Sequence, residues 1–160
     1  MRKRILVTGG CGFIGSNFVR LLLAERPEWE VVNLDKLTYA GRLENLEDVA
    51  HHPNYRFLKG DICDPSAVTA AMAGCQMAVN FAAETHVDRS LLGAAHFLDT
   101  DIKGVLVLLE GARRVGLERF VQISTDEVYG SIAEGSFTEE SVLNPRNPYS
   151  ASKAGGDRLA

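Results

Sequence analysis

The sequence predicts an α/β fold in which helices cover both faces of a doubly wound parallel sheet. Five short apolar runs, each typical of a strand, alternate with segments of helical periodicity along the 160 residues. A glycine-rich turn at residues 9–15 joins the first strand to the first helix. Parallel strands joined by helices need right-handed crossovers. We therefore expect the strand order 3-2-1-4-5, with a crevice between strands 1 and 4.

The first strand and the turn after it form a candidate phosphate-binding loop. Apolar residues 5–7 precede the turn, and Gly9, Gly12 and Gly15 punctuate it. Glycine lets a backbone approach a pyrophosphate closely, while the helix that follows offers free N–H groups and the positive end of its dipole. The pattern alone is weak, because a plain strand-to-helix turn can also be rich in glycine.

The other elements are placed by periodicity and by capping residues. Asp64 and Asn147 are expected N-caps, and Gly116 is expected to end a long helix. Further strands are expected at 30–34, 55–59, 77–83 and 119–124, and helices at 43–51, 65–73, 92–115 and from 148 onward. The expected core stripes are Ile14, Phe18, Leu21 and Leu22 in the first helix and Val105, Leu108, Leu109 and Ala112 in the long helix.

Asp35 closes the second strand, 20 residues after Gly15. A dinucleotide-binding fold of the Rossmann type places an acid at this spacing to bind the adenosine ribose hydroxyls. A turn or helix-capping aspartate is the commoner alternative. Such an acid favours NAD, because it would repel the 2′-phosphate of NADP, although the neighbouring Lys36 leaves NADP open. Asp61 follows the third strand, at the sheet edge where ligands bind.

Tyr149 and Lys153 lie one turn apart on the helix that is expected to begin at Pro148. A lysine ammonium beside a phenol is expected to lower the phenol pKa from about 10 toward neutrality. Tyr149 could then take a proton from a sugar hydroxyl while the carbon loses hydride to NAD. An ordinary exposed Tyr/Lys pair is the alternative. Gly155 and Gly156 lie inside the same helix, where each costs up to about 1 kcal/mol relative to alanine.

Adjacent acids follow the fifth strand. Asp126 and Glu127 come directly after Thr125, on the ligand-binding edge of the sheet. They are either solvated loop residues or a proton donor and a proton acceptor. Thr125 could bind the same substrate hydroxyl as Tyr149.

Composition argues against several other classes of protein. The net charge is −4 and no basic run occurs, which argues against a nucleic-acid partner. No run approaches the roughly 20 apolar residues of a membrane span, and no signal peptide is recognisable. Three cysteines and four histidines show neither a disulfide framework nor metal-ligand spacing, so no metal is predicted and a reduced, cytoplasmic setting is expected. Because Ala160 falls within a helix, we expect residues 1–160 to be the NAD-binding domain. It would be the N-terminal part of a longer enzyme whose C-terminal substrate part is absent from this chain.

These motifs resemble the extended short-chain dehydrogenase/reductase family of nucleotide-sugar enzymes. The resemblance rests on the glycine turn, Asp35 and the Tyr149/Lys153 pair, and it covers all 160 residues. The stretches at 35–41, 82–90 and 124–130 are most similar to dTDP-glucose 4,6-dehydratases. Sugar epimerases of the family usually carry small residues at the positions of Asp126 and Glu127, so the acid pair is the most specific signal.

The resemblance implies a set of cofactor and substrate contacts. Thr85 and Thr125 would touch the glucose. NAD would contact Gly9, Gly12, Phe13, Ile14, Gly15, Asp35, Lys36, Leu37, Thr38, Asp61, Ile62, Phe81, Ala82, Ala83, Glu84, Thr85, Thr100, Tyr149 and Lys153.

The same resemblance implies a lyase reaction with Thr125, Asp126, Glu127, Tyr149 and Lys153 as catalytic residues. Tyr149 would deprotonate the 4-hydroxyl of dTDP-glucose as hydride passes to NAD. Glu127 would remove the C5 proton, and Asp126 would protonate the 6-hydroxyl so that water leaves. The product would be dTDP-4-keto-6-deoxyglucose, and a homodimer is implied. The alternatives are another NAD-dependent nucleotide-sugar epimerase or decarboxylase, or a non-catalytic dinucleotide-binding module.

Overall fold

A computed structural model describes residues 3–160 and contains the predicted parallel sheet. All four neighbouring strand pairs are parallel, and the order β3-β2-β1-β4-β5 confirms the predicted topology. The strands are β1 (Arg4–Thr8), β2 (Glu30–Asp35), β3 (Tyr55–Lys59), β4 (Met77–Asn80) and β5 (Arg119–Gln122). The order reverses between β1 and β4, which is where a ligand is expected to bind.

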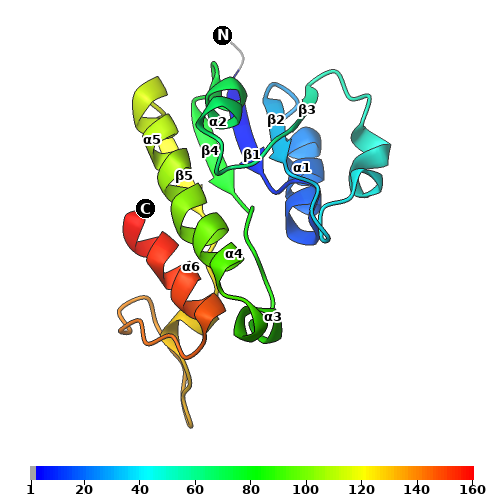
Figure 1. Ribbon diagram of the computed structural model, residues 1–160. Coiled ribbons are helices and arrows are strands. Elements are labelled where there is room, and N and C mark those ends of the chain that lie inside the picture. Colours follow the sequence, from blue (N-terminus) through cyan, green and yellow to red (C-terminus); the bar gives the residue numbers. More distant parts are fainter. Residues whose placement is uncertain (1–2) are drawn as a thin grey trace.

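Helices cover both faces of the sheet, as Figure 1 shows. One face is covered by α1 (Phe13–Glu25) and η1 (Leu43–Val49), and the other by α2 (Pro65–Met72) and α5 (Val105–Val115). α6 (Pro148–Leu159) lies beside α5 (Figure 1). The shorter elements are α3 (Val87–Leu92), α4 (Ala95–Leu98), the π-helical turn η2 (Asp99–Gly104) and the 3₁₀ turn η3 (Asp126–Tyr129). No helix within residues 3–160 has the length and apolar character needed to cross a membrane.

The central strand β1 alternates its side chains between two cores. Leu6 packs with α2 and α5, whereas Ile5 and Val7 pack with α1. All three side chains are buried, which explains why the strand is an uninterrupted apolar run. The sheet is thus fixed from both sides, and its carboxyl-terminal edge is held in a defined position.

Helix boundaries follow the predicted caps. The Asp64 carboxylate accepts a hydrogen bond from the Ser66 N–H, and Asn147 Oδ1 accepts one from the Ser150 N–H, both at 2.8 Å. Gly116 ends α5 with a left-handed φ of 70°. The sequence therefore places these helix ends correctly through local chemistry.

Some expectations were wrong in detail. Ile14 and Leu21 of α1 are 62% and 55% exposed, because the helix packs through a face that includes the small residues Gly15 and Ser16. The helix expected at 92–115 is divided, because α3 ends at Leu92, α4 begins at Ala95 and the π-helical turn η2 separates α4 from α5. β4 and β5 end earlier than expected, since the chain leaves the sheet after Asn80 and Gln122.

Candidate active site

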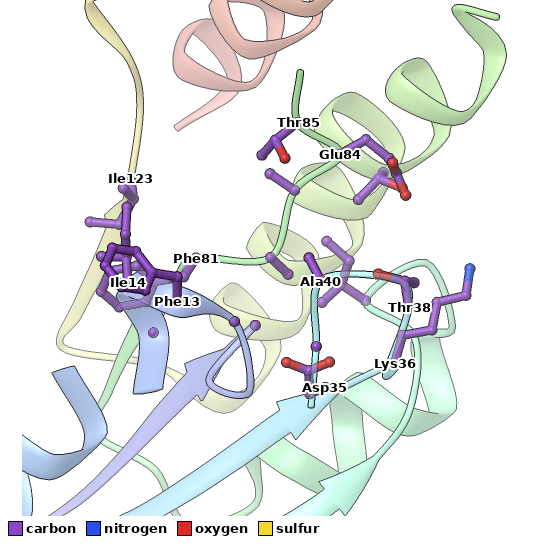
Figure 2. A pocket seen from close by; sticks show the side chains of 18 of the residues that line it. Phe13, Ile14, Asp35, Lys36, Thr38, Ala40, Phe81, Glu84, Thr85 and Ile123 are labelled. Atoms are coloured by element: carbon purple, nitrogen blue, oxygen red, sulfur yellow. The ribbon is translucent and has the colours of Figure 1, made fainter. Parts of the chain in front are cut away.

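A cavity of about 400 Å³ lies at the carboxyl ends of β1, β2 and β4. It occupies the predicted crevice, where the strand order reverses. Figure 2 shows Phe13, Ile14 and Ile123 on one side of the cavity, with Asp35, Lys36, Thr38 and Ala40 on the other. Glu84 and Thr85 extend over it from the segment after β4. The cavity is therefore assembled from residues that are distant in the sequence.

The turn between β1 and α1 requires glycine at two positions. Gly9 has a φ of +67°, and a Cβ atom there would lie 2.5 Å from the Ala82 nitrogen. A Cβ atom on Gly15 would lie 2.3 Å from the Gly9 carbonyl oxygen. The N-cap residue Gly12 provides no side-chain cap, so the amides in the first turn of α1 keep their donors available. This turn is a backbone cradle suited to an anion.

Side chains from β2 hold the turn in place. Asn33 Oδ1 accepts a 3.1 Å hydrogen bond from the Gly10 N–H, and Asp35 Oδ2 accepts one of 2.8 Å from the Cys11 N–H. The Cys11 side chain is fully buried, and desolvation followed by the nearby Asp35 charge raises the pKa of its thiol to about 11. Cys11 is therefore a protonated packing residue and not a nucleophile.

Asp35 lines the cavity from the end of β2. Its Oδ1 accepts a 2.8 Å hydrogen bond from the Leu37 N–H, which fixes the carboxylate at the end of β2. Lys36 forms a 2.7 Å ion pair with Asp61, and this hydrogen bond raises the pKa of the Lys36 ammonium. Leu37 has a positive φ of 58°, and its side chain packs in the core on the α1 side. Of the predicted cofactor contacts, Leu37 alone does not line the cavity.

The other predicted cofactor contacts all line the cavity, as do residues that sequence reasoning missed. Those predicted are Gly9, Gly12, Phe13, Ile14, Gly15, Asp35, Lys36, Thr38, Asp61, Ile62, Phe81, Ala82, Ala83, Glu84, Thr85, Thr100, Tyr149 and Lys153. Those missed are Leu34, Ala40, Gly41, Gly60, His86, Ile123 and Ser124. Gly60 and Ile123 directly follow a strand, and that position was the signal that could have found them.

Tyr149 and Lys153 enter the cavity from α6. The Lys153 side chain is almost fully buried, and its Nζ donates a 2.6 Å hydrogen bond to the Ile123 carbonyl oxygen. Burial lowers the pKa of Lys153, whereas the charges of Asp101 and Asp157 oppose this effect.

The expectation that Lys153 lowers the Tyr149 pKa was wrong. Burial raises the pKa of Tyr149, and the negative charges of Asp101, Glu127 and Asp126 raise it further, against a hydrogen bond from Thr125. The physical reason is that the phenol is partly desolvated among carboxylates, while the Lys153 ammonium is engaged by a backbone carbonyl.

The carboxyl pair lies beside the cavity and not on its lining. Asp126 lines a neighbouring open hollow together with Thr125 and Asp157, and Ser124 lines both spaces. Glu127 accepts hydrogen bonds from Ser150 Oγ at 3.2 Å and from Asn147 Nδ2 at 3.3 Å. The structure therefore joins η3 to the start of α6 and brings both acids close enough to affect Tyr149. Among the described residues, 3–160, no group of three or more His, Cys, Asp or Glu side chains is placed to hold a metal ion.

Comparisons with known proteins agree with this geometry. The sequence matches the family model described as GDP-mannose 4,6 dehydratase over residues 6–160. It is 56% identical to the low-salt glycan biosynthesis protein Agl12 of Haloferax volcanii, covering 97% of this chain and 50% of that protein. It is 54% identical to a dTDP-glucose 4,6-dehydratase of Streptomyces griseus, covering 100% of this chain and 49% of that one.

A solved structure is also similar. DesIV, a dTDP-glucose 4,6-dehydratase from Streptomyces venezuelae with NAD and TYD bound, superposes with a TM-score of 0.94 at 52% identity. The match covers 98% of this chain and 50% of DesIV. The chain thus spans about half the length of the curated relatives it matches. The chain belongs to the family that the GDP-mannose 4,6 dehydratase model describes, among the extended short-chain dehydrogenase/reductases.

Proposed function

We propose that this chain is the NAD-binding half of a dTDP-glucose 4,6-dehydratase. One observation carries the proposal: Tyr149 and Lys153 share a cavity with the glycine turn and Asp35, and Asp126 lines the adjoining hollow, with Glu127 next to it on η3. The similarity to dTDP-glucose 4,6-dehydratases over nearly the whole chain supports the same substrate class.

The residues of the cavity fit a dinucleotide. The glycine turn leaves no room for a Cβ atom at Gly9 or Gly15, and it presents backbone donors suited to a pyrophosphate. Asp35 offers carboxylate oxygens to a ribose, and Phe81, Ala82 and Ile62 supply apolar walls. NAD bound here would take up the C4 hydride of the sugar and later return it to C6.

Tyr149 acts as the base at the sugar 4-hydroxyl in this proposal. The Thr125 side chain forms a hydrogen bond with the Tyr149 phenol. A hydroxyl that binds to the phenol would therefore also lie within reach of Thr125. Lys153 is held by Ile123 through one of its three donors, which leaves the others for the cofactor ribose and the phenol. The partial burial of Tyr149 keeps water from competing for the transferred proton.

The carboxyl pair performs the elimination. Glu127 removes the C5 proton, and Asp126 donates a proton to the 6-hydroxyl, so that the C6–O bond breaks and water leaves. The proton returns to C5 when hydride reaches C6, which saturates the C5–C6 double bond. A hexose reaching from the cavity across Ser124 would meet Asp126, since Ser124 lines both spaces, and Glu127 is the next residue of η3. The nucleotide of the substrate would be bound by a further part of the enzyme. Assembly as a homodimer and a cytoplasmic location belong to the same proposal and rest on the family resemblance.

A second candidate is a nucleotide-sugar epimerase or decarboxylase that uses Tyr149 and Lys153 alone. It is favoured by the position of Asp126 and Glu127 outside the main cavity. A dinucleotide-binding module without turnover is a third possibility.

Incubation of the full-length protein and NAD with glucose linked to dTDP, UDP, GDP or CDP distinguishes these candidates. We expect dTDP-glucose to give the alkali-dependent absorbance of a 4-keto-6-deoxy sugar, with loss of water seen by mass spectrometry. Epimerised sugar of unchanged mass would support the second candidate. NAD binding without any product would support the binding module.

A further inference from the structure

Asp101 is a buried carboxylate to which the proposed chemistry assigns no role. It lies in η2 with 2% of its surface exposed. Its Oδ1 accepts a 2.9 Å hydrogen bond from the Glu84 N–H, and its Oδ2 accepts one of 2.8 Å from Ser152 Oγ. Asp101 therefore connects the segment after β4, which lines the cavity, with the helix that carries Tyr149 and Lys153.

The backbone is built so that Asp101 can reach both partners. η2 is a π-helical turn, which widens the helix by one residue per turn. A Cβ atom on Gly156 would lie 2.6 Å from the Asp101 carbonyl oxygen, and one on Gly155 would lie 2.9 Å from Ile102 Cδ1. The two glycines inside α6 are thus explained, because they let η2 and α6 approach closely enough for the Ser152 contact.

The charged and titratable groups that face Asp101 belong to the active site. Lys153 and Tyr149 face it from α6, and Glu84 faces it from the segment after β4. Burial raises the pKa of Asp101 from 3.8 to about 6, against the hydrogen bonds from Ser152 and Glu84 and the Lys153 charge. In turn, the Asp101 charge raises the pKa of both Lys153 and Tyr149.

We propose that Asp101 is a positioning residue whose two hydrogen bonds fix α6 against the Glu84–Thr85 segment, and that its negative charge acts on the helix that carries Tyr149 and Lys153. The part that concerns Tyr149 rests on the function proposed above. A purely structural anchor would need the two hydrogen bonds but not the charge.

Asp101→Asn separates the charge from the hydrogen bonds. The amide oxygen can accept from the Glu84 N–H, and the amide nitrogen can donate to Ser152 Oγ, whose hydroxyl already lies 2.8 Å from the Tyr149 carbonyl oxygen. In the full-length enzyme we expect both limbs of the pH profile of kcat to move about one pH unit lower, because a nearby negative charge has been removed from both groups.

Ser152→Ala is the matched structural control, since it deletes one hydrogen bond and retains the carboxylate. We expect its stability to fall while the limbs of the pH profile stay in place at and above neutral pH. If Asp101→Asn leaves both limbs where they are in the wild type, the charge has no tuning role and the proposal is wrong.

Thermal unfolding of the NAD-free, full-length protein tests the same carboxyl group without turnover. A raised folded-state pKa means that the stability contributed by the protonated form is complete below about 3.8 and is lost as pH rises toward about 6. Relative to Asp101→Asn, the wild type should lose stability over this window, because the two proteins share every other titrating group. Ser152→Ala should lose this stability at a higher pH than the wild type does, because its Asp101 carboxylate has lost the hydrogen bond from Ser152.

These readings separate the two proposals. One outcome is that the unfolding profiles of the wild type and Asp101→Asn differ while no nucleotide sugar is turned over. That outcome would reject the proposed function and would leave the inference that Asp101 titrates in place. Parallel unfolding profiles for wild type and Asp101→Asn would reject the inference on Asp101 even in an active enzyme. If Asp101→Asn does not fold, Ser152→Ala takes its place in the comparison. An unfolding profile with the same pH dependence in Ser152→Ala as in the wild type would then reject the inference on Asp101.

Discussion

The glycine-turn side of the active site and the carboxyl-pair side are built in different ways. Asp35 is 7% exposed and accepts two backbone hydrogen bonds of 2.8 Å. Glu127 is exposed and is held by side-chain hydrogen bonds of 3.2 and 3.3 Å, and Asp126 faces an open hollow. The cofactor side is therefore preformed by the sheet, whereas the acids sit on a short 3₁₀ turn that a bound hexose could reposition.

Tyr149→Phe changes a residue that lies between the two sides, and it should have the largest effect on kcat. Removing the phenolic oxygen deletes the proposed base, and kcat should fall by about 10³-fold. The ring and its edge contact with Phe97 remain, so dinucleotide binding should change little. Steady-state kinetics and titration calorimetry with NAD measure the two quantities. Loss of both together would mean that Tyr149 is mainly structural.

Gly15→Ala tests whether the cofactor side is as rigid as its packing indicates. The new methyl group would meet backbone atoms of Gly9 and Gly10 within 3 Å, and these cannot rotate away. We expect the free energy of unfolding to fall by about 3 kcal/mol, together with a weaker affinity for NAD.

Gly93→Ala is the control for this substitution. Its Cβ atom would have no neighbour within 4 Å, and its φ is −171°, which any residue adopts. Chemical denaturation should therefore show a change within about 0.5 kcal/mol. Equal losses in the two variants would mean that glycine content, and not the close approach at Gly15, limits stability.

Glu127→Gln addresses the carboxyl-pair side and should have a smaller effect on kcat, of about 10²-fold. The amide keeps the size of the side chain and an oxygen that can accept from Ser150 and Asn147. NAD affinity and thermal stability should stay near wild-type values. Exchange of the C5 hydrogen with deuterated water, followed by NMR, reports the proton step directly. An unaltered exchange rate would assign that step to another group.

The parts of the fold that depend on local chemistry were predictable from sequence. The N-caps Asp64 and Asn147 and the C-terminal Gly116 mark helix ends through contacts within a few residues. The strand order followed from the alternation of elements. The expected stripe of α1 placed Leu22 and Phe18 correctly, but the Gly15–Ser16 part of the buried face was not predictable, because these residues pack by being small and carry no apolar signal.

The electrostatics of the site depend on tertiary contacts and could not be predicted. The spacing of Tyr149 and Lys153 correctly placed both in one cavity. It could not show that Lys153 is bound by the Ile123 carbonyl or that Asp101 approaches from another helix. A polar residue in an expected helix is normally predicted to face solvent, whereas Asp101 is buried in the π-helical turn η2.

The ion pair between Lys36 and Asp61 bears on selectivity between the two forms of the dinucleotide. A 2′-phosphate entering here would need Lys36 as its counter-ion, yet that ammonium is already 2.7 Å from a carboxylate. Such a partly exposed pair is worth at most about 1 kcal/mol, or roughly a fivefold penalty for breaking it. The Asp35 carboxylate is fixed by two backbone N–H groups and would repel the 2′-phosphate, so it would be the main source of discrimination against the phosphorylated form.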